Sequence, residues 1–268
     1  MPTVSVIIPT CNRRPRLQEA LASVLAQTSP ADELIVIDDG STDDTAAWMQ
    51  ALAANPSRPV VRYLRQDNAG PAAARNRGIA AAGGEWIALL DDDDVWLPTK
   101  LERQRAILSH RPGLNLLGVA SDLMPVRSQG AVVAVGVAAL LVRNRFTTSG
   151  VLLRRDAFNA VGGFREDMRC CEDYDLWLRI AARHGCAILD EALVSYGKDK
   201  RGFGDSGLTA DLAALARGER QAVVNWQRWS GGPRIVAAVG LILCALRAGR
   251  RRILAWRWRH GARRGVSA

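Results

Sequence analysis

Four consecutive aspartates, Asp91–Asp94, directly follow the apolar run Trp86–Leu90. Carboxylates a few ångströms apart disfavour one another's ionised forms, so such a run at the end of a buried strand is electrostatically unfavourable. A divalent cation would relieve this repulsion, and a ligand set made only of oxygens suits Mg²⁺ or Mn²⁺ better than zinc. The alternative is a polar loop before a helix that begins near Pro98, where acidic residues favour the helix dipole. The run alone leaves both alternatives open.

Two other acidic pairs stand at positions where a carboxylate could act on a ligand. Asp38-Asp39 follows the apolar run Leu34–Ile37, and Glu172-Asp173 opens a segment with helical spacing of apolar residues. The structural alternatives are a turn with a helix N-cap for the first pair and dipole-stabilising acids for the second.

The elements that must position these residues alternate between strands and helices over the first hundred residues. Short β-branched runs predict four strands, Val4–Ile8, Leu34–Ile37, Val60–Leu64 and Trp86–Leu90. This alternation predicts a mostly parallel sheet, in which ligands bind beyond the carboxyl ends of the strands. The four strands end in polar clusters at Thr10–Arg13, Asp38-Asp39, Asn68 with Arg75, and Asp91–Asp94. We therefore expect these clusters to meet at one edge of the sheet.

The second half has a less regular pattern. The apolar run Ala131–Val142 is too short to span a bilayer and is predicted to be core. Thr148–Leu153 is predicted to be a strand, Glu172–His184 a helix and Ala187–Tyr196 a further strand. With 268 residues, the chain is long enough for one large α/β core with an appendage.

Charge is distributed unevenly along the chain. The net charge is +9, yet residues 1–219 contain 25 basic and 27 acidic side chains, a net of −2, because residues 220–268 contain eleven arginines and no acidic residue. Such asymmetry indicates an anionic partner for the tail. The five cysteines lack CxxC spacing and are expected to be reduced thiols in a cytoplasmic protein. The N-terminus, without a basic region or signal-type apolar run, favours the same location.

Five sequence segments together resemble glycosyltransferase family 2, whose members have the GT-A fold. They are Val4–Arg13, Glu33–Asp43, Asn68–Gly78, Leu90–Asp94 and Glu172–Leu178. The resemblance covers about residues 2–200 and lies in the order and spacing of the motifs, since a single Asp-Asp-Gly turn is common. It implies an α/β fold with a Rossmann-like, mostly parallel central sheet flanked by helices. The expected domains are a GT-A domain at 1–205, with a nucleotide-binding half at 1–97 and an acceptor half at 98–205, and a helical extension at 206–268.

The resemblance assigns nucleotide contacts to the ends of the first strands. It implies that Pro9, Thr10 and Arg13 surround the base and that Asp39 accepts from a uracil-type ring N–H. A fixed acceptor opposite an imide N–H selects uracil or thymine, which favours a UDP-sugar. Arg75 is either an exposed helix charge or a contact to the base or diphosphate.

The resemblance identifies the aspartate run with the DxD motif of the family. It implies Asp93 as the direct metal ligand, with Asp91 as the second, and Asp91 or Asp92 as the contact to the ribose. Because the four aspartates are consecutive, the DxD motif can be aligned with them in two ways that differ by one residue. The implied cofactor is Mn²⁺ or Mg²⁺, which would stabilise charge on the leaving nucleotide.

Inversion at the sugar carbon needs one base opposite the leaving group. The resemblance places the acid pair of the family at Glu172-Asp173, with Asp173 as the base and Glu172 as a helix-start charge or a partner of the base, although the two could be exchanged. Thr148, Ser149 and Gly163 match the acceptor side, the alternative being a plain strand and turn. Many relatives carry a histidine after the last core strand. Residues 195–204 contain none, and Lys198, Lys200 or Arg201 could neutralise phosphate instead.

The tail combines the apolar run Ile235–Leu246 with six arginines between Arg247 and Arg259, together with Trp256 and Trp258. The run is shorter than the ~20 residues needed to cross a bilayer. We expect it to lie in the interface of an anionic membrane. The alternatives are a helix packed on the core and, less in keeping with the composition, a nucleic-acid contact.

The predicted function is therefore a metal-dependent, inverting hexosyltransferase. It would move a sugar from a nucleoside-diphosphate sugar to a saccharide or lipid-linked saccharide in cell-envelope glycan synthesis. The expected location is the cytoplasmic face of the cell membrane. The alternatives are a nucleotidyltransferase, which would release pyrophosphate, and a non-catalytic module that binds sugar nucleotides or membrane.

Overall fold

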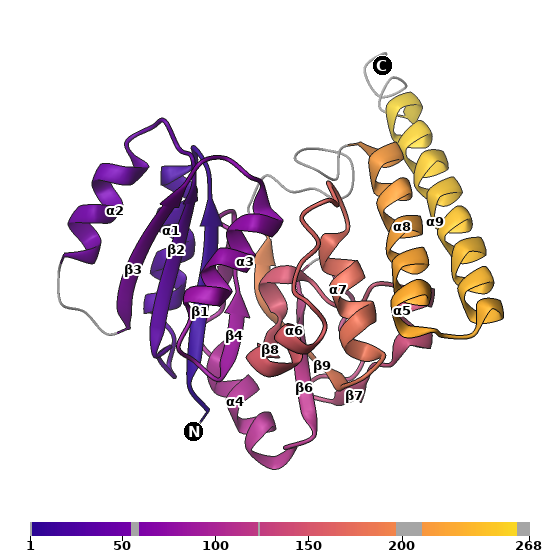
Figure 1. The fold of residues 1–268 in the computed structure, drawn as a ribbon, viewed down its shortest axis with the longest axis horizontal. Coiled ribbons are helices and arrows are strands. Elements are labelled where there is room, and N and C mark those ends of the chain that lie inside the picture. Colours follow the sequence, from indigo (N-terminus) through magenta and orange to yellow (C-terminus); the bar gives the residue numbers. More distant parts are fainter. Residues whose placement is uncertain (1, 55–58, 123, 197–210, 262–268) are drawn as a thin grey trace.

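The computed structural model describes residues 2–54, 59–122, 124–196 and 211–261, with side chains described as far as residue 255. Figure 1 shows a central sheet with helices on both sides and two long helices at the edge opposite α2. The strands are β1 (Val4–Thr10), β2 (Glu33–Asp39), β3 (Val60–Gln66), β4 (Trp86–Leu89), β5 (Asp94–Trp96), β6 (Leu114–Ser121), β7 (Val132–Ala134), β8 (Leu152–Arg154) and β9 (Gly185–Tyr196).

All the described strands belong to one sheet. Its order is β3-β2-β1-β4-β8-β6-β9-β5, with β7 paired to β9. The first four strands are parallel, and β6 also pairs with β9 in parallel. The pairs β4–β8, β6–β8, β5–β9 and β7–β9 are antiparallel. The predicted α/β class is confirmed, and the sheet is continuous across residue 97, because β4 pairs with β8 of the second half.

Helices cover both faces of this sheet. They are α1 (Arg14–Leu25), α2 (Thr45–Ala53), α3 (Pro71–Ala81), α4 (Lys100–His110), α5 (Val137–Val142), α6 (Arg155–Ala160), α7 (Glu172–Ala181), α8 (Leu212–Ser230) and α9 (Arg234–Gly261), with a 3₁₀ turn η1 at Thr148–Gly150. Side chains alternate along β1, so Val6 and Ile8 belong to the core shared with α1, α2 and α4, and Ile7 to the core shared with α3 and α7. This alternation explains why the β-branched runs predicted the strands correctly.

Two predicted elements of the second half differ from the structure. Thr148–Leu153 was expected to be one strand, but its first half is η1 and the strand β8 begins only at Leu152. The Gly150 N–H donates to Thr147 O across this turn, and a Cβ at Gly150 would lie 2.9 Å from Val119 O, so the tight turn requires glycine. The run Ala131–Val142, expected to be core, divides into β7 and α5, and it leaves Val133 and Val142 exposed.

The C-terminal extension packs on the same core as the sheet. Val223 and Trp226 of α8 and Cys244 of α9 are buried in the core cluster that contains Ile7 and Trp177. Asn225 of α8 also donates to the buried carboxylate of Asp175 on α7, with an N–O distance of 3.0 Å. Among the described residues, no helix is long and apolar enough to cross a membrane. The alternative of a tail helix packed on the core is therefore correct for the inner faces of α8 and α9.

Candidate active site

The aspartate run lies against the end of β1. Thr10 Oγ1 donates to Asp92 Oδ2 at 2.8 Å, and Arg13 Nη1 lies 3.3 Å from Asp92 Oδ1 and 3.4 Å from Asp93 Oδ2. Burial raises the pKa of Asp92 to about 6, although the Thr10 hydroxyl and the Arg13 charge oppose this change. Parallel strands place these groups together, because β1 and β4 are neighbours and both end at this edge of the sheet.

The pair after β2 organises the neighbouring loops. Asp38 accepts from the Ser41 N–H at 2.7 Å and from the Tyr63 hydroxyl at 2.5 Å, so the turn alternative is correct for this residue. Asp39 accepts from the backbone N–H groups of Ala69 and Gly70, each at 2.8 Å, and from the Gln66 side chain, also at 2.8 Å. The Asp39 carboxylate thus holds the loop that precedes α3, and a nucleotide contact would be an additional role for it.

Arg75 joins the two acidic motifs of the chain. This buried residue on α3 donates from Nη2 to Asp91 Oδ1 at 2.7 Å and from Nη1 to Glu172 Oε1 at 2.8 Å, and its guanidinium lies 5.5 Å from the Phe164 ring centroid. Burial alone would lower the pKa of Arg75, but the charges of Asp91 and Glu172 outweigh it and raise the pKa above its ordinary value. The alternative of an exposed helix charge is therefore wrong.

The carboxylates at the start of α7 have different surroundings. Glu172 is buried in its ion pair with Arg75, whereas Asp173 is half-buried and accepts from the Tyr174 N–H at 2.7 Å. Burial and, next, the charge of Glu172 raise the pKa of Asp173 to about 7, against the opposing effects of the Tyr174 N–H and the Arg75 charge. Within the described part of the chain, no ion pair holds Asp173. A carboxylate that titrates near neutral pH can act as a general base.

Asp175, two residues further on, faces the protein interior. It is fully buried, and its Oδ2 accepts from Arg179 Nε at 2.8 Å. Trp177 is also fully buried, so it belongs to the core rather than to the site. The first turn of α7 therefore divides its acidic residues between the site and the packing against α8.

The predicted acceptor-side residues occupy two turns. Ser149 of η1 is buried, donates to Asp94 Oδ2 at 2.6 Å and accepts from the Asp91 N–H at 3.1 Å, so it holds both ends of the aspartate run. Thr148 beside it is half-buried. Gly163 has a φ of 70° and its carbonyl accepts from Arg179 at 2.8 Å. The turn alternative thus accounts for the contacts of Ser149 and Gly163.

The four aspartates differ in how they could meet a metal. Asp94 is buried and begins β5, and Asp92 is directed to Thr10, while the side chains of Asp91 and Asp93 are 31% and 15% exposed. Among the described residues, no group of three or more histidine, cysteine or acidic side chains could hold a metal ion. Magnesium sites commonly combine one or two carboxylates with substrate phosphates, so Asp91 and Asp93 fit an ion shared with a substrate.

Sequence patterns missed Asn12 as a residue that shapes the site. Its φ is 54°, and its side-chain oxygen accepts from the Thr42 N–H at 2.7 Å, which fastens the loop after β1 to the loop after β2. Asparagine tolerates this left-handed conformation better than most residues, so the Cys-Asn-Arg turn contained a usable signal.

Comparisons with known proteins agree with this geometry. Residues 5–124 match the family described as Glycosyl transferase family 2. The putative colanic acid biosynthesis glycosyl transferase WcaA of Escherichia coli (strain K12) is 30% identical over 195 residues, which cover 69% of this chain and 68% of that relative. The chain belongs to glycosyltransferase family 2.

Other relatives match this chain over a smaller share of their own length. A glycosyltransferase of Rickettsia conorii is 33% identical over 202 residues, but the chain spans only about a third of it, 32%. The putative teichuronic acid biosynthesis glycosyltransferase TuaG of Bacillus subtilis (strain 168) is 41% identical over 110 residues, which cover 41% of this chain and 43% of that relative.

Solved structures of glycosyltransferases confirm the fold. Residues 1–349 of S. aureus TarS superpose with a TM-score of 0.69 at 18% identity, over 91% of this chain and 70% of that structure. The mannosyltransferase PcManGT of Pyrobaculum calidifontis also gives 0.69, at 20% identity, over 91% of this chain and 73% of that structure. The GT-A fold predicted for this family 2 chain is thereby shown.

The structure brings most of the residues predicted from the family together. Pro9, Thr10 and Arg13 lie at the end of β1 beside Asp92, and Arg75 connects Asp91 to Glu172. Lys198, Lys200 and Arg201, expected to replace the missing histidine, lie outside the described residues. The roles of the site residues stay predictions, whereas their convergence is a property of the fold.

Proposed function

We propose that this family 2 enzyme transfers a hexosyl group, with inversion, from a nucleoside-diphosphate sugar to a hydroxyl of a saccharide or lipid-linked saccharide. The observation that supports this proposal most strongly is the link through Arg75. It ties an aspartate run suited to a diphosphate-bound metal to Glu172. The next residue is Asp173, whose pKa of about 7 suits a general base. The Arg75 ion pairs therefore hold the aspartate run next to the first turn of α7, where the proposed base stands.

The donor is proposed to be a UDP-sugar bound beyond the ends of β1 and β2. TarS has been crystallised with UDP-GlcNAc, and PcManGT with GDP-Man and Mn²⁺, which supports a nucleotide sugar for this fold. Pro9, Thr10 and Arg13 would surround the base. Asp39 would accept from the uracil ring N–H with a lone pair not used by the loop, since a carboxylate has about four acceptor positions. Asp92 would meet the ribose.

Asp93 and Asp91 would hold a divalent cation, Mn²⁺ or Mg²⁺, which would supply positive charge for the leaving diphosphate. Arg75 already contacts Asp91, so its proposed role is to position that carboxylate rather than to bind the base itself. Arg13 would add positive charge near the donor, since its guanidinium is about half-exposed beside Asp93.

In the proposed reaction, the acceptor hydroxyl oxygen forms a bond to the anomeric carbon of the sugar. The proton of that hydroxyl passes to the Asp173 carboxylate, and the bond from the anomeric carbon to the diphosphate oxygen breaks. The nucleoside diphosphate leaves with that electron pair. Glu172, held by Arg75, keeps a negative charge beside the base and raises its basicity.

The acceptor is proposed to be an envelope polysaccharide or its lipid-linked precursor. The printed names of two relatives refer to teichuronic acid and colanic acid biosynthesis, which supports this class of acceptor. Thr148 is the proposed contact on the acceptor side, because Ser149 and Gly163 already use their polar groups within the protein.

The first test is product analysis with UDP-sugars, Mn²⁺ and a saccharide acceptor. We expect release of a nucleoside diphosphate by the wild type, and a loss of about 10²–10⁴-fold in kcat for Asp173→Asn with donor binding retained. Asp156→Asn, an exposed aspartate on α6, is the matched control and should keep wild-type turnover. Release of pyrophosphate, binding without release, or an Asp173→Asn variant as active as the control would each contradict the proposal.

The second test is the pH dependence of kcat/KM. Asp173 must be ionised to accept a proton, so the rate should rise with pH through about 7 and then level off. Glu172→Gln removes the neighbouring negative charge that raises the pKa of Asp173, so the midpoint should move to lower pH. An unchanged midpoint, or one at higher pH, would show that Asp173 is not the titrating base.

The third test concerns the metal. Chelation with EDTA should abolish transfer, and added Mn²⁺ should restore it. Asp93→Asn should raise the Mn²⁺ concentration for half-maximal activity at least tenfold, because one of two carboxylate ligands is lost. Asp156→Asn again serves as the control. Full activity in EDTA would exclude the metal assignment, whereas an unchanged Mn²⁺ requirement in Asp93→Asn would exclude Asp93 as its ligand.

A further inference from the structure

We propose that one face of α9 docks on the surface of an anionic lipid bilayer, with the helix lying along the membrane. This outer α9 face consists of Ile235, Val239, Ile242, Leu246 and Ile253. Its spacing of three, four and seven residues places all five side chains on one side of the helix. The inference concerns a binding surface and is independent of the reaction proposed for the active site.

The outer α9 face is apolar and exposed in the folded protein. Its five side chains are between 50% and 75% exposed. The opposite face is already packed, since Ala237 and Cys244 are buried and a Cβ at Gly240 would lie 2.9 Å from the Leu141 side chain. The core therefore holds α9 in place without help from the outer face, and that face is a contiguous apolar strip that needs a partner.

The arginines of α9 fall into two groups. Arg247 and Arg251 form ion pairs with Glu219 of α8, and Arg247 also donates to Leu141 O at 2.6 Å, so these two hold the helix on the protein. Arg250 and Arg252 are exposed beside the apolar strip. The guanidinium groups of this second pair are placed to meet lipid phosphates while the apolar side chains enter the interface.

The end of α5 beside the strip is also apolar and basic. At the end of α5, Val142 is 61% exposed and is followed by the exposed Arg143 and Arg145. Arg247 donates to Val142 O at 2.9 Å, which places this end of α5 against α9. Residues 220–268 contain no acidic side chain. Charge complementarity therefore favours an anionic surface, to which each basic residue adds attraction.

Charge also distinguishes a membrane from a second copy of the chain. Two copies joined through the outer α9 face would bring their exposed arginines together without an acidic partner from that region, which is unfavourable. A bilayer accepts both the apolar strip and its positive flank. Crossing of the bilayer by α9 is not proposed, because no described helix is long and apolar enough.

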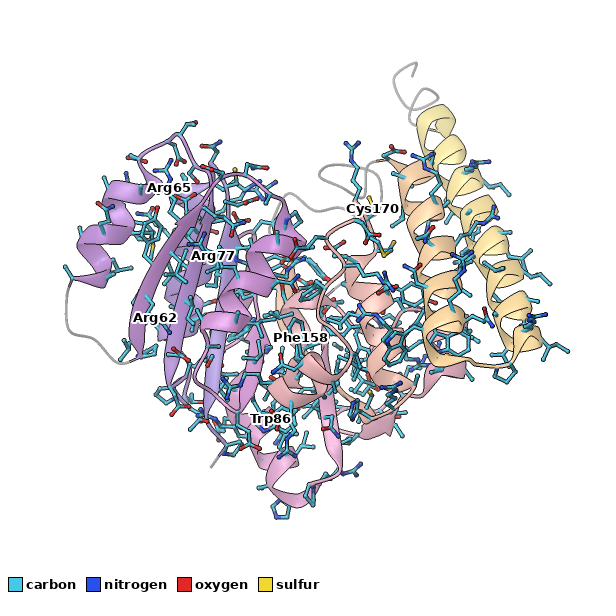
Figure 2. The ribbon with its side chains drawn as sticks, viewed as in Figure 1. Arg62, Arg65, Arg77, Trp86, Phe158 and Cys170 are labelled. Atoms are coloured by element: carbon cyan, nitrogen blue, oxygen red, sulfur yellow. The ribbon has the colours of Figure 1, made fainter. Side chains whose placement is uncertain are left out.

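The placement of α9 suits an enzyme that acts at a membrane. Figure 1 shows α9 at the edge of the molecule farthest from α2, with its C-terminal end at the top of the view. Figure 2 shows Cys170, which precedes α7, on that same side of the molecule. The start of α7, which contains Asp173, therefore lies on the side of the C-terminal half of α9, the half that contains Arg250 and Arg252.

The test is flotation of the full chain with vesicles of neutral phosphatidylcholine or of phosphatidylcholine with 30% phosphatidylglycerol. The wild type should bind the anionic vesicles at least tenfold better than the neutral ones. Ile242→Glu with Leu246→Glu should reduce this binding at least tenfold. The matched control, Val60→Glu with Val133→Glu, changes two apolar side chains that are also exposed but lie on other elements, and it should bind like the wild type.

A charge-reversal pair tests the arginines separately. Arg250→Glu with Arg252→Glu should weaken binding to the anionic vesicles at least tenfold and leave binding to neutral ones unchanged. Arg77→Glu with Arg111→Glu is the control, since both are exposed and Arg77 lies on α3, far from α9 in Figure 2. Circular dichroism melts verify that all four variants are folded.

Three results would overturn the proposal. The first is wild-type protein that does not float with anionic vesicles. The second is outer-face variants that bind vesicles as well as their controls do. The third is a wild type that does not bind vesicles but forms a dimer without lipid, if Ile242→Glu with Leu246→Glu dissociates that dimer. The last result would assign the outer α9 face to a second copy. None of the three bears on sugar transfer to a soluble acceptor, so failure here is distinguishable from failure of the proposed function.

Discussion

A buried guanidinium, that of Arg75, lies between carboxylates from two distant parts of the chain. Asp91 follows β4, and Glu172 begins α7, so the ion pairs connect the parallel half of the sheet to the second half. Arg75 and Glu172 are buried and Asp91 is partly buried, and burial of ionised groups is unfavourable unless their charges and hydrogen bonds are matched. Because both carboxylates meet one guanidinium, the fold fixes Asp173 relative to the aspartate run, and the proposed chemistry depends on that spacing.

Much of this arrangement could be predicted from the sequence, because the relevant signals are local. The β-branched runs with polar ends correctly predicted the positions of β1, β2, β3 and β4. In a parallel sheet, the carboxyl ends of these strands then have to lie at the same edge. The acid pair Glu172-Asp173, followed by apolar residues at helical spacing, correctly predicted the start of α7. The roles of Glu172 and Asp173 stay a prediction, but the structure separates their surroundings, since Glu172 is buried against Arg75 and Asp173 is half-buried.

The rest depended on contacts between residues far apart in sequence. Asp94 looked like part of a polar run, but it is buried because Ser149 reaches it from η1, 55 residues further along. Arg75 offered no sign of burial, because one of its partners follows β4 and the other begins α7. The extension looked like a separate tail, yet Trp226 and Cys244 complete the core of the catalytic fold. Composition predicted its basic, apolar character but not which arginines face Glu219.

The central claim is that Arg75 and Glu172 interact directly inside the folded protein. A double-mutant cycle with Arg75→Met and Glu172→Gln, measured as the free energy of unfolding in urea at pH 8, tests it most directly. Arg75→Met should cost about 3–5 kcal/mol, since it leaves the buried Glu172 carboxylate without its ion-pair partner. The double variant should lose at least about 1 kcal/mol less than the sum of the single losses. Additivity within about 0.5 kcal/mol would contradict the account.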